Sequence, residues 1–131
     1  MAQKRSLVLR TIYALCLLGA TYNHWTAIYQ HGFNWDYGGV PKASAAFWTA
    51  LAFLDPAIVA LLFIRPKTGV VATIAIMIFD VIQNVWIQAH YFAPLLLALA
   101  DSPQVIEQIV FMIFVVITAP FAWGPRRQAT S

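Results

Sequence analysis

The sequence is poor in charge and in cysteine. Only 10% of its 131 residues are Asp, Glu, Lys or Arg, whereas a soluble domain carries about 25%. Because 61% of the residues are hydrophobic, the chain has too little polar surface to stay dissolved, and a lipid bilayer is its natural solvent. The single cysteine, Cys16, excludes an internal disulfide and a cysteine pair for metal or redox chemistry. It stands in an apolar run, where we interpret it as a small buried side chain.

Three further classes of partner have little support in the sequence. No two of the histidines, His24, His31 and His90, have the spacing of a helical ligand pair, so we predict no metal site. No motif indicates a cofactor. The basic residues stand at the ends of predicted helices and form no patch with interleaved aromatic residues, so we expect no nucleic-acid partner. The partner that the composition does predict is membrane lipid.

Four runs of the sequence are long and apolar enough for membrane helices, which need about 20 mostly apolar residues to cross the hydrocarbon core. They cover residues 7–29, 43–64, 68–90 and 104–123. Turn-forming or helix-ending residues separate them: Gly38-Gly39-Val40-Pro41, Arg65-Pro66-Lys67, Ser102-Pro103 and Gly124-Pro125. We interpret the first run as a retained helix, because no small-residue cleavage site follows it. The prediction is one all-α domain over residues 1–131, an integral membrane four-helix bundle.

The distribution of Lys and Arg predicts the orientation of this bundle. With four crossings, seven of the eight basic residues fall on one side, and only Lys42 lies opposite. Because basic residues favour the cytoplasmic side, we predict that both termini are cytoplasmic. The membrane would be a bacterial inner membrane or a eukaryotic endomembrane. The seven residues on the predicted cytoplasmic side are Lys4, Arg5, Arg10, Arg65, Lys67, Arg126 and Arg127.

Polar side chains collect at one depth of the predicted bundle. An ionisable group at the centre of a membrane helix costs roughly 2.5–3.5 kcal/mol on the insertion scale, so each one needs an explanation. Counting along the helices brings all of these groups to the non-cytoplasmic half. On the third helix, Asp80, Gln83, Asn84 and Gln88 share one face, which would be turned toward the bundle interior. The candidate ligand-binding residues are His24, Trp48, Asp55, Asp80, Gln83, Asn84 and Glu107.

The second predicted helix carries Asp55 directly before Pro56. Proline lacks the N–H that would bond the carbonyl four residues earlier, and it disfavours helical geometry in the residue before it. We therefore predict a kink that frees the carbonyl of Ala52 and turns the Asp55 carboxylate inward. The face through Trp48, Ala52, Asp55 and Val59 would then line the interior.

Structural roles compete with a ligand site for each of these residues. Asp80 and Asn84 could form a hydrogen-bonded pair that holds helices together, and a buried acid can stay protonated. His24 could be a hydrogen-bonded residue of a helix interface. Glu107 could complement the positive end of its helix. Taken as a set, however, two acids on adjacent helices with His24 and Glu107 at similar depth favour a lined cavity, which could bind a cation, relay a proton or do acid/base work.

The run from Phe53 to Tyr91 resembles the second and third helices of the EXPERA group, which includes the emopamil-binding sterol isomerase and the sigma-2 receptor. The resemblance lies in Pro56, in the short basic turn and in the polar stretch from Asp80 to His90. Asn23-His24 stands where the isomerase has a histidine. The resemblance implies four core helices around a pocket for lipid-like or sterol-like molecules. It does not extend to isomerisation, since Ile28 and the region of Trp48 stand where the isomerase has acids. DoxX-like proteins are an alternative family.

Three functions follow from these patterns. The leading one is a bundle that binds or modifies a lipid-like, apolar small molecule, and whether it is an enzyme is left open. The second is a structural or accessory subunit, joined to a second copy of the chain or to other chains of a membrane complex. The third is a proton- or cation-coupled transporter. It has less support, because the sequence shows no polar path to the cytoplasmic half and no inverted repeat.

Overall fold

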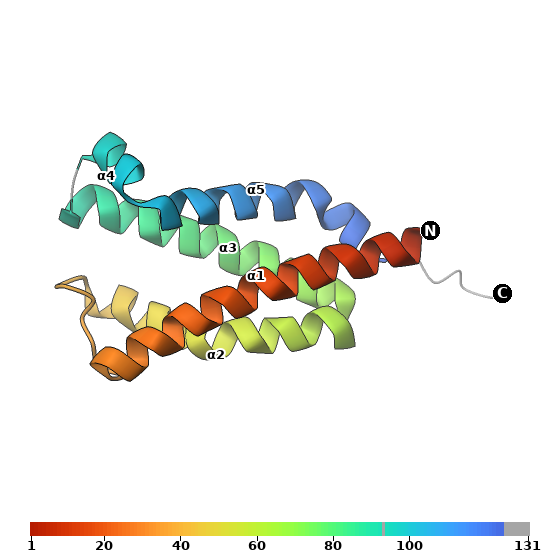
Figure 1. Cartoon of the computed structure of the whole chain (residues 1–131), viewed down its shortest axis with the longest axis horizontal. Helices are drawn as coiled ribbons and strands as arrows, with labels where there is room; N and C mark the ends of the chain where they lie inside the picture. The colour runs from red at the N-terminus through yellow and green to blue at the C-terminus, as the bar shows by residue number, and fades with distance from the viewer. Residues whose placement is uncertain (93, 125–131) are drawn as a thin grey trace.

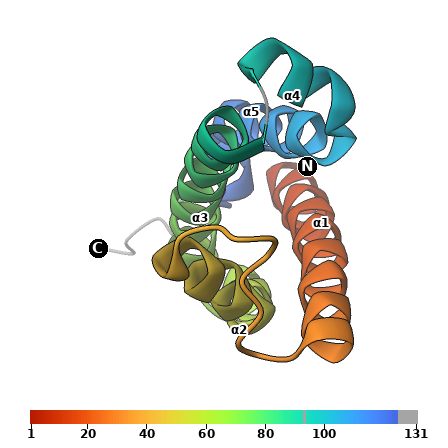
Figure 2. The ribbon, with the colours of Figure 1, turned by 90° about the vertical axis from the view of Figure 1, so that its left-hand side faces the viewer.

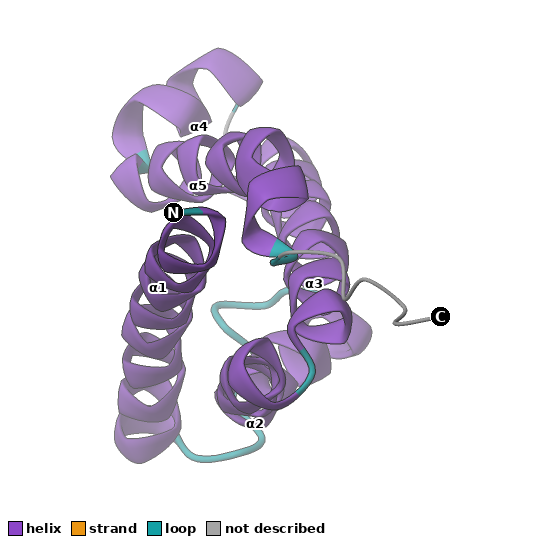
Figure 3. Cartoon of the chain, turned by 90° about the vertical axis from the view of Figure 1, so that its right-hand side faces the viewer, coloured by secondary structure: helices purple, strands orange, loops and turns teal. Residues whose placement is uncertain are grey.

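Helices make up nearly all of the structure, a computed structural model that describes residues 1–92 and 94–124, without the side chains of Leu95, Ala98 and Leu99. No strand occurs within these ranges, as Figure 3 shows. The elements, labelled in Figure 1, are α1 (Ala2–His31), α2 (Lys42–Ile64), α3 (Pro66–Ile87), the π-helical turn η1 (Gln88–Phe92), α4 (Leu95–Asp101) and α5 (Pro103–Ala122).

The helices lie where the apolar runs predict them, with two differences. Helix α1 begins at Ala2 rather than at residue 7, because Lys4 and Arg5 are good helix formers and extend the helix beyond its apolar part. The third run ends in η1, and the predicted interfacial segment after it forms the short helix α4. Pro125, Arg126 and Arg127, which the sequence places after the last helix, lie outside the described residues.

Three helices in the described part of the chain are long and apolar enough to cross a membrane: Lys42–Ile64, Pro66–Phe92 and Pro103–Ala122. The protein is therefore a helical protein with the composition of an integral membrane protein. Helix α1 has 30 residues, which exceeds the length that a crossing requires. It is not among the helices that are apolar enough to cross a membrane, since Arg10, Asn23 and His24 interrupt its apolar residues.

The four long helices pack side by side in a ring, in the order α1, α2, α3, α5 and back to α1. Figure 2 shows this ring from one end, with α4 lying outside it beside α5. Arg65 alone separates α2 from α3, so these two helices are antiparallel neighbours, as the turn sequence predicts. Helices α1 and α3 lie across the ring from each other and hardly touch.

Hydrogen bonds tie the helix ends together at one end of the ring. The Ser6 hydroxyl donates to the Ala122 carbonyl at 2.8 Å, which joins the start of α1 to the end of α5. Arg10 donates from Nη1 to the Leu62 carbonyl at 2.7 Å. The last carbonyls of a helix lack intrahelical partners and carry partial negative charge, so a cationic donor is favourable there. Lys4 and Arg5, near the start of α1, therefore lie at the same end as the α2–α3 turn.

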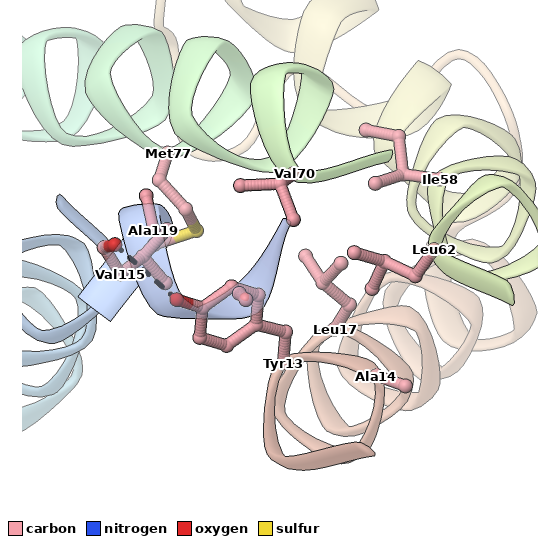
Figure 4. Close-up of a cluster of buried hydrophobic side chains, with 10 residues drawn as sticks. Tyr13, Ala14, Leu17, Ile58, Leu62, Val70, Met77, Val115 and Ala119 are labelled. Atoms are coloured by element: carbon pink, nitrogen blue, oxygen red, sulfur yellow. Dashed lines mark hydrogen bonds between the residues drawn. The ribbon is translucent and has the colours of Figure 1, made fainter. Parts of the chain in front are cut away.

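A cluster of buried apolar side chains fills the half of the ring next to this basic end (Figure 4). Tyr13 lies at its centre and is fully buried. Its hydroxyl donates to the Val115 carbonyl at 3.3 Å and pairs with the Thr118 hydroxyl, while its ring packs edge-on against Phe111 and Phe114. The other fully buried members of the cluster are Leu17, Leu62, Val70, Val115 and Ala122.

Gly69 allows the closest approach between α2 and α3. A methyl group added at this position would overlap the backbone of Leu62. We predict that Gly69→Ala destabilises the protein by about 1 kcal/mol or more, since backbone overlap costs roughly 1–3 kcal/mol and exceeds the ~1 kcal/mol that alanine gains over glycine in a helix. Reversible unfolding in mixed detergent–SDS micelles would measure the change.

Gly19→Ala is the matched control, because nothing lies within 4 Å of a methyl group added at Gly19. We expect it to be neutral or stabilising by up to ~1 kcal/mol. Equal effects of the two substitutions would contradict the close approach at Gly69.

Candidate functional site

A pocket of about 910 Å³ lies inside the ring, in the half away from the basic end. All four long helices contribute to its lining, together with η1 and the loop between α1 and α2. A smaller, polar pocket of about 340 Å³ adjoins it beside α4 and shares Asn84, Gln88, Gln104 and Gln108 with it. The polar residues that line the main pocket are Asn23, His24, Asp55, Asp80, Asn84, Gln88, Gln104, Glu107 and Gln108.

Two carboxyl groups form the polar centre of this pocket. Asp55 on α2 is 3% exposed and Asp80 on α3 is 8% exposed, and the two interact electrostatically. His24 approaches from α1, with Nε2 3.9 Å from Oδ2 of Asp55. This separation is too long for a hydrogen bond. The pocket therefore brings together His24, Asp55 and Asp80 from three helices, and no hydrogen bond joins these three described side chains to one another.

The hydrogen bond between Asp80 and Asn84 lies within α3. Asn84 Nδ2 donates to Asp80 Oδ1 at 2.8 Å and to the Asp80 carbonyl at 2.9 Å. A bond between residues four apart on one helix cannot join two helices, so this pair does not act as interhelical glue. Instead, it fixes the Asp80 carboxyl on the wall of the pocket. The polar bond that does join α2 to α3 runs from Ser44 Oγ to Gln83 Oε1, at 3.0 Å.

Two polar atoms in the pocket wall are buried without a hydrogen-bond partner among the described residues. They are the indole Nε1 of Trp48 and Oε1 of Gln108. The Trp48 indole lies beside the Asp80 carboxyl but does not reach hydrogen-bond geometry with it. Buried polar groups are nearly always paired, and leaving one unpaired costs about 1–3 kcal/mol. An unpaired donor thus lies within the α2 wall, beside Asp80, and an unpaired acceptor lies within the α5 wall.

Stacked aromatic rings cover the outer edge of the pocket. His31 stacks on Trp35 with centroids 3.8 Å apart, and Trp35 stacks on Tyr37 at 4.3 Å. Tyr37 then meets Trp48 edge-on at 5.2 Å. Trp35, Tyr37 and Trp48 line the pocket. Val40 anchors the same loop by packing into a small apolar cluster with Ala45 and Ile87.

The Pro56 position is stabilised by a contact that the sequence does not reveal. Helix α2 continues through Pro56, which has no N–H for the Ala52 carbonyl. Trp25 on α1 supplies the missing donor, with Nε1 3.0 Å from the Ala52 oxygen. The predicted free carbonyl therefore exists and is satisfied by the neighbouring helix. Trp25 thereby holds α1 against the turn of α2 that carries Asp55.

Six of the seven candidate residues line the main pocket: His24, Trp48, Asp55, Asp80, Asn84 and Glu107. Glu107 lies at its exposed edge. The seventh, Gln83, lies outside the lining and bonds to Ser44. The lining also includes Gln108, Gly19 and Ala20, which are not among the seven candidates. No group of three or more His, Cys, Asp or Glu side chains in the described ranges is arranged to hold a metal ion.

Comparison of the chain with protein-family models, curated proteins and solved structures gave no match.

The Trp25–Ala52 hydrogen bond predicts that two substitutions depend on each other. Trp25→Phe removes the donor and leaves the Ala52 carbonyl unpaired, so we expect a destabilisation of about 1–2 kcal/mol. Pro56→Ala supplies a backbone N–H that can bond the same carbonyl. In that background, Trp25→Phe should cost at least ~0.5 kcal/mol less. Unfolding of the four proteins in mixed micelles measures this coupling.

Trp86→Phe is the control for the loss of an indole, since Trp86 is similarly exposed and its ring stacks on His90. Its cost should be the same with Pro56 and with Ala at that position. Additive effects of Trp25→Phe and Pro56→Ala would show that Trp25 does not compensate for the proline.

Proposed function

We propose that the chain is a four-helix membrane bundle that holds a lipid-like amphiphile in the pocket enclosed by α1, α2, α3 and α5. The polar head of this molecule would hydrogen-bond at the outer half of the pocket. Its apolar part would lie against Leu17, Leu51 and Met77, which line the pocket and are buried. A lipid-like ligand is also what the resemblance to the EXPERA group implies.

The observation that carries this proposal is the pair of buried, unpaired polar atoms in the pocket wall. Trp48 Nε1 can only donate and Gln108 Oε1 can only accept. Asp80, whose Oδ1 accepts from Asn84, also lines the pocket. A hydroxyl group both donates and accepts, so a molecule with a hydroxyl head can pair with either kind of group. An apolar molecule would leave them unpaired, at about 1–3 kcal/mol each.

The exposed surface of α1 supports its place as the fourth crossing. Val8, Ile12, Leu15 and Leu18 form an exposed apolar stripe, which suits contact with lipid chains. Tyr22, Trp25 and Tyr29 continue this surface toward the outer end, and aromatic rings are enriched at membrane interfaces. The polar residues Asn23 and His24 are turned to the pocket instead. Four crossings place Lys4, Arg5, Arg65 and Lys67 on one side, which we take to be cytoplasmic.

Coupled transport is less well supported than binding. The apolar cluster around Tyr13, Leu62 and Val70 fills the ring between the pocket and the basic end. Each of these three side chains is fully buried. No polar pathway crosses this cluster in the described residues, and a coupled transporter needs access from both sides.

Mass spectrometry of the protein purified in mild detergent tests the proposal. The wild type should retain an amphiphile at near-stoichiometric amount, in excess of the bulk lipid. Asp80→Asn and Trp48→Phe each remove a partner for the head group, and we expect the retained amount to fall by about tenfold, since such bonds are worth ~1.5–3 kcal/mol. Asp55→Asn should lower it as well.

Asp36→Asn is the matched control for the loss of a carboxylate. Asp36 lies in the exposed loop before α2, where Oδ1 accepts from the Gly38 N–H at 3.1 Å. Asparagine keeps an acceptor at this place, so the retained amphiphile should be unchanged. The same bound species at the same amount in all variants would contradict a binding pocket at these residues.

A further inference from the structure

The hydrogen bonds and ring contacts that join α1 to α5 lie in the half next to the basic end. There, Ser6 bonds to Ala122 and Tyr13 packs on Phe111, Phe114 and Val115. Beyond Tyr13 the two helices diverge. Figure 1 shows α1 running obliquely away from α5, and Figure 3 shows the start of α1 close to α5 and the rest of α1 receding from it.

The residues of α1 beyond this contact both line the pocket and are exposed. Cys16, Gly19 and Asn23 have this double character, and their spacing of three and four residues puts them along one side of the helix. On α5, Gln104 and Glu107 are likewise exposed pocket-lining residues. A residue that lines a pocket and is also exposed lies at its opening. Together with Tyr22, these residues place an opening of the pocket between α1 and α5, while Phe92 on η1, which is also exposed and lines the pocket, marks its outer end.

The inner part of this opening faces hydrocarbon if the helices cross a membrane. The outward side chains beside it are apolar: Leu15 on α1 is 64% exposed and Val110 on α5 is 60% exposed. Gly19 adds no side chain to the opening, and the space beside it is empty: a Cβ built there would meet nothing within 4 Å. Toward the outer end the edges become polar, with Asn23 and Glu107. The edges of the opening are thus polar at the outer end and apolar toward the midplane. A lipid of the outer leaflet has the same order, with its head group outside and its hydrocarbon chain toward the midplane.

We propose that the opening between α1 and α5 is a lateral portal, through which an amphiphile with a hydroxyl head enters from the outer leaflet. The head reaches Trp48, Gln108 and Asp80, while the hydrocarbon tail lies across Gly19 and stays partly in the bilayer. This inference rests on the proposed binding function and adds the direction from which the ligand arrives and the class of molecule that fits.

Photolabelling in a bilayer tests the portal. The protein is reconstituted in phosphatidylcholine vesicles that contain hexadecanol with a diazirine in the middle of its chain, and labelled peptides are mapped after illumination. Labels should concentrate on residues 16–27 of α1 and 104–111 of α5. Gly19→Trp places an indole across the opening and should lower this labelling by about tenfold, as expected for an added cost of ~1.4 kcal/mol.

Leu18→Trp is the matched control, since it adds the same indole at an exposed position of α1 that does not line the pocket. Its labelling should equal that of the wild type. Cys16 provides a second block that does not depend on folding of a variant. The prediction that it is buried is wrong, because Cys16 lies at the opening and is exposed. A bulky maleimide added to the folded protein should therefore lower the labelling too. Cys16→Ala treated in the same way controls for the reagent.

Each result separates the portal from the binding function. If Gly19→Trp and the alkylated protein keep wild-type labelling of the pocket residues, the portal is wrong and the binding function stands. If labels spread evenly over all outward helix faces, the portal is equally excluded. If pocket residues take no label and the purified protein retains no amphiphile, the proposed function itself fails.

Discussion

The packing of Tyr13 between α1 and α5 closes the ring of helices, and the rest of the structure depends on where this closure lies. The side chain is fully buried and both its ring and its hydroxyl contact α5. Because Tyr13 lies in the first half of α1, it seals only the half of the ring next to the basic end. A second large side chain at the level of Gly19 or Ala20 would have extended the seal. Small residues there leave the space that becomes the pocket.

The second constraint is the proline at position 56. A helix that loses a hydrogen bond in an apolar environment must find another donor, since no water is present to supply one. Trp25 does so from α1, which fixes the spacing of α1 and α2 one turn from Asp55. The Trp25–Ala52 hydrogen bond thus sets the spacing of α1 and α2, as Gly69 sets the spacing of α2 and α3. In both places, a backbone feature of α2 or α3 determines how near the adjacent helix comes.

Much of the fold could be predicted from the sequence because hydropathy and turn residues act locally. The apolar runs gave the helix positions, and Arg65-Pro66 gave the antiparallel pair. The four-residue spacing of Asp80, Asn84 and Gln88 correctly indicated a shared polar face, since all three line the pocket. Contacts between distant segments could not be read in this way. Nothing in the sequence pairs Trp25 with Ala52, or turns Gln83 from the pocket toward Ser44, because rotation of one helix against its neighbour depends on packing along its whole length.

The site was predicted only in part for a related reason. Ionisable residues stand out in an apolar sequence, so Asp55, Asp80 and His24 were visible. An opening, in contrast, is formed where side chains are absent. A glycine such as Gly19 within a helical sequence does not indicate that a pocket opens there. Trp48 and Gln108 are the most informative residues of the pocket for the same reason: each is identified by the absence of a partner.

Two buried acids, each costing roughly 2.5–3.5 kcal/mol in a membrane helix, together with two unpaired polar atoms, would be a poor arrangement for a bundle whose only task is to hold itself together. Ser44 and Gln83 show that this chain can join helices with one neutral bond. The polarity around Asp80 exceeds that need, and the bound amphiphile that we propose would account for it by sharing these groups.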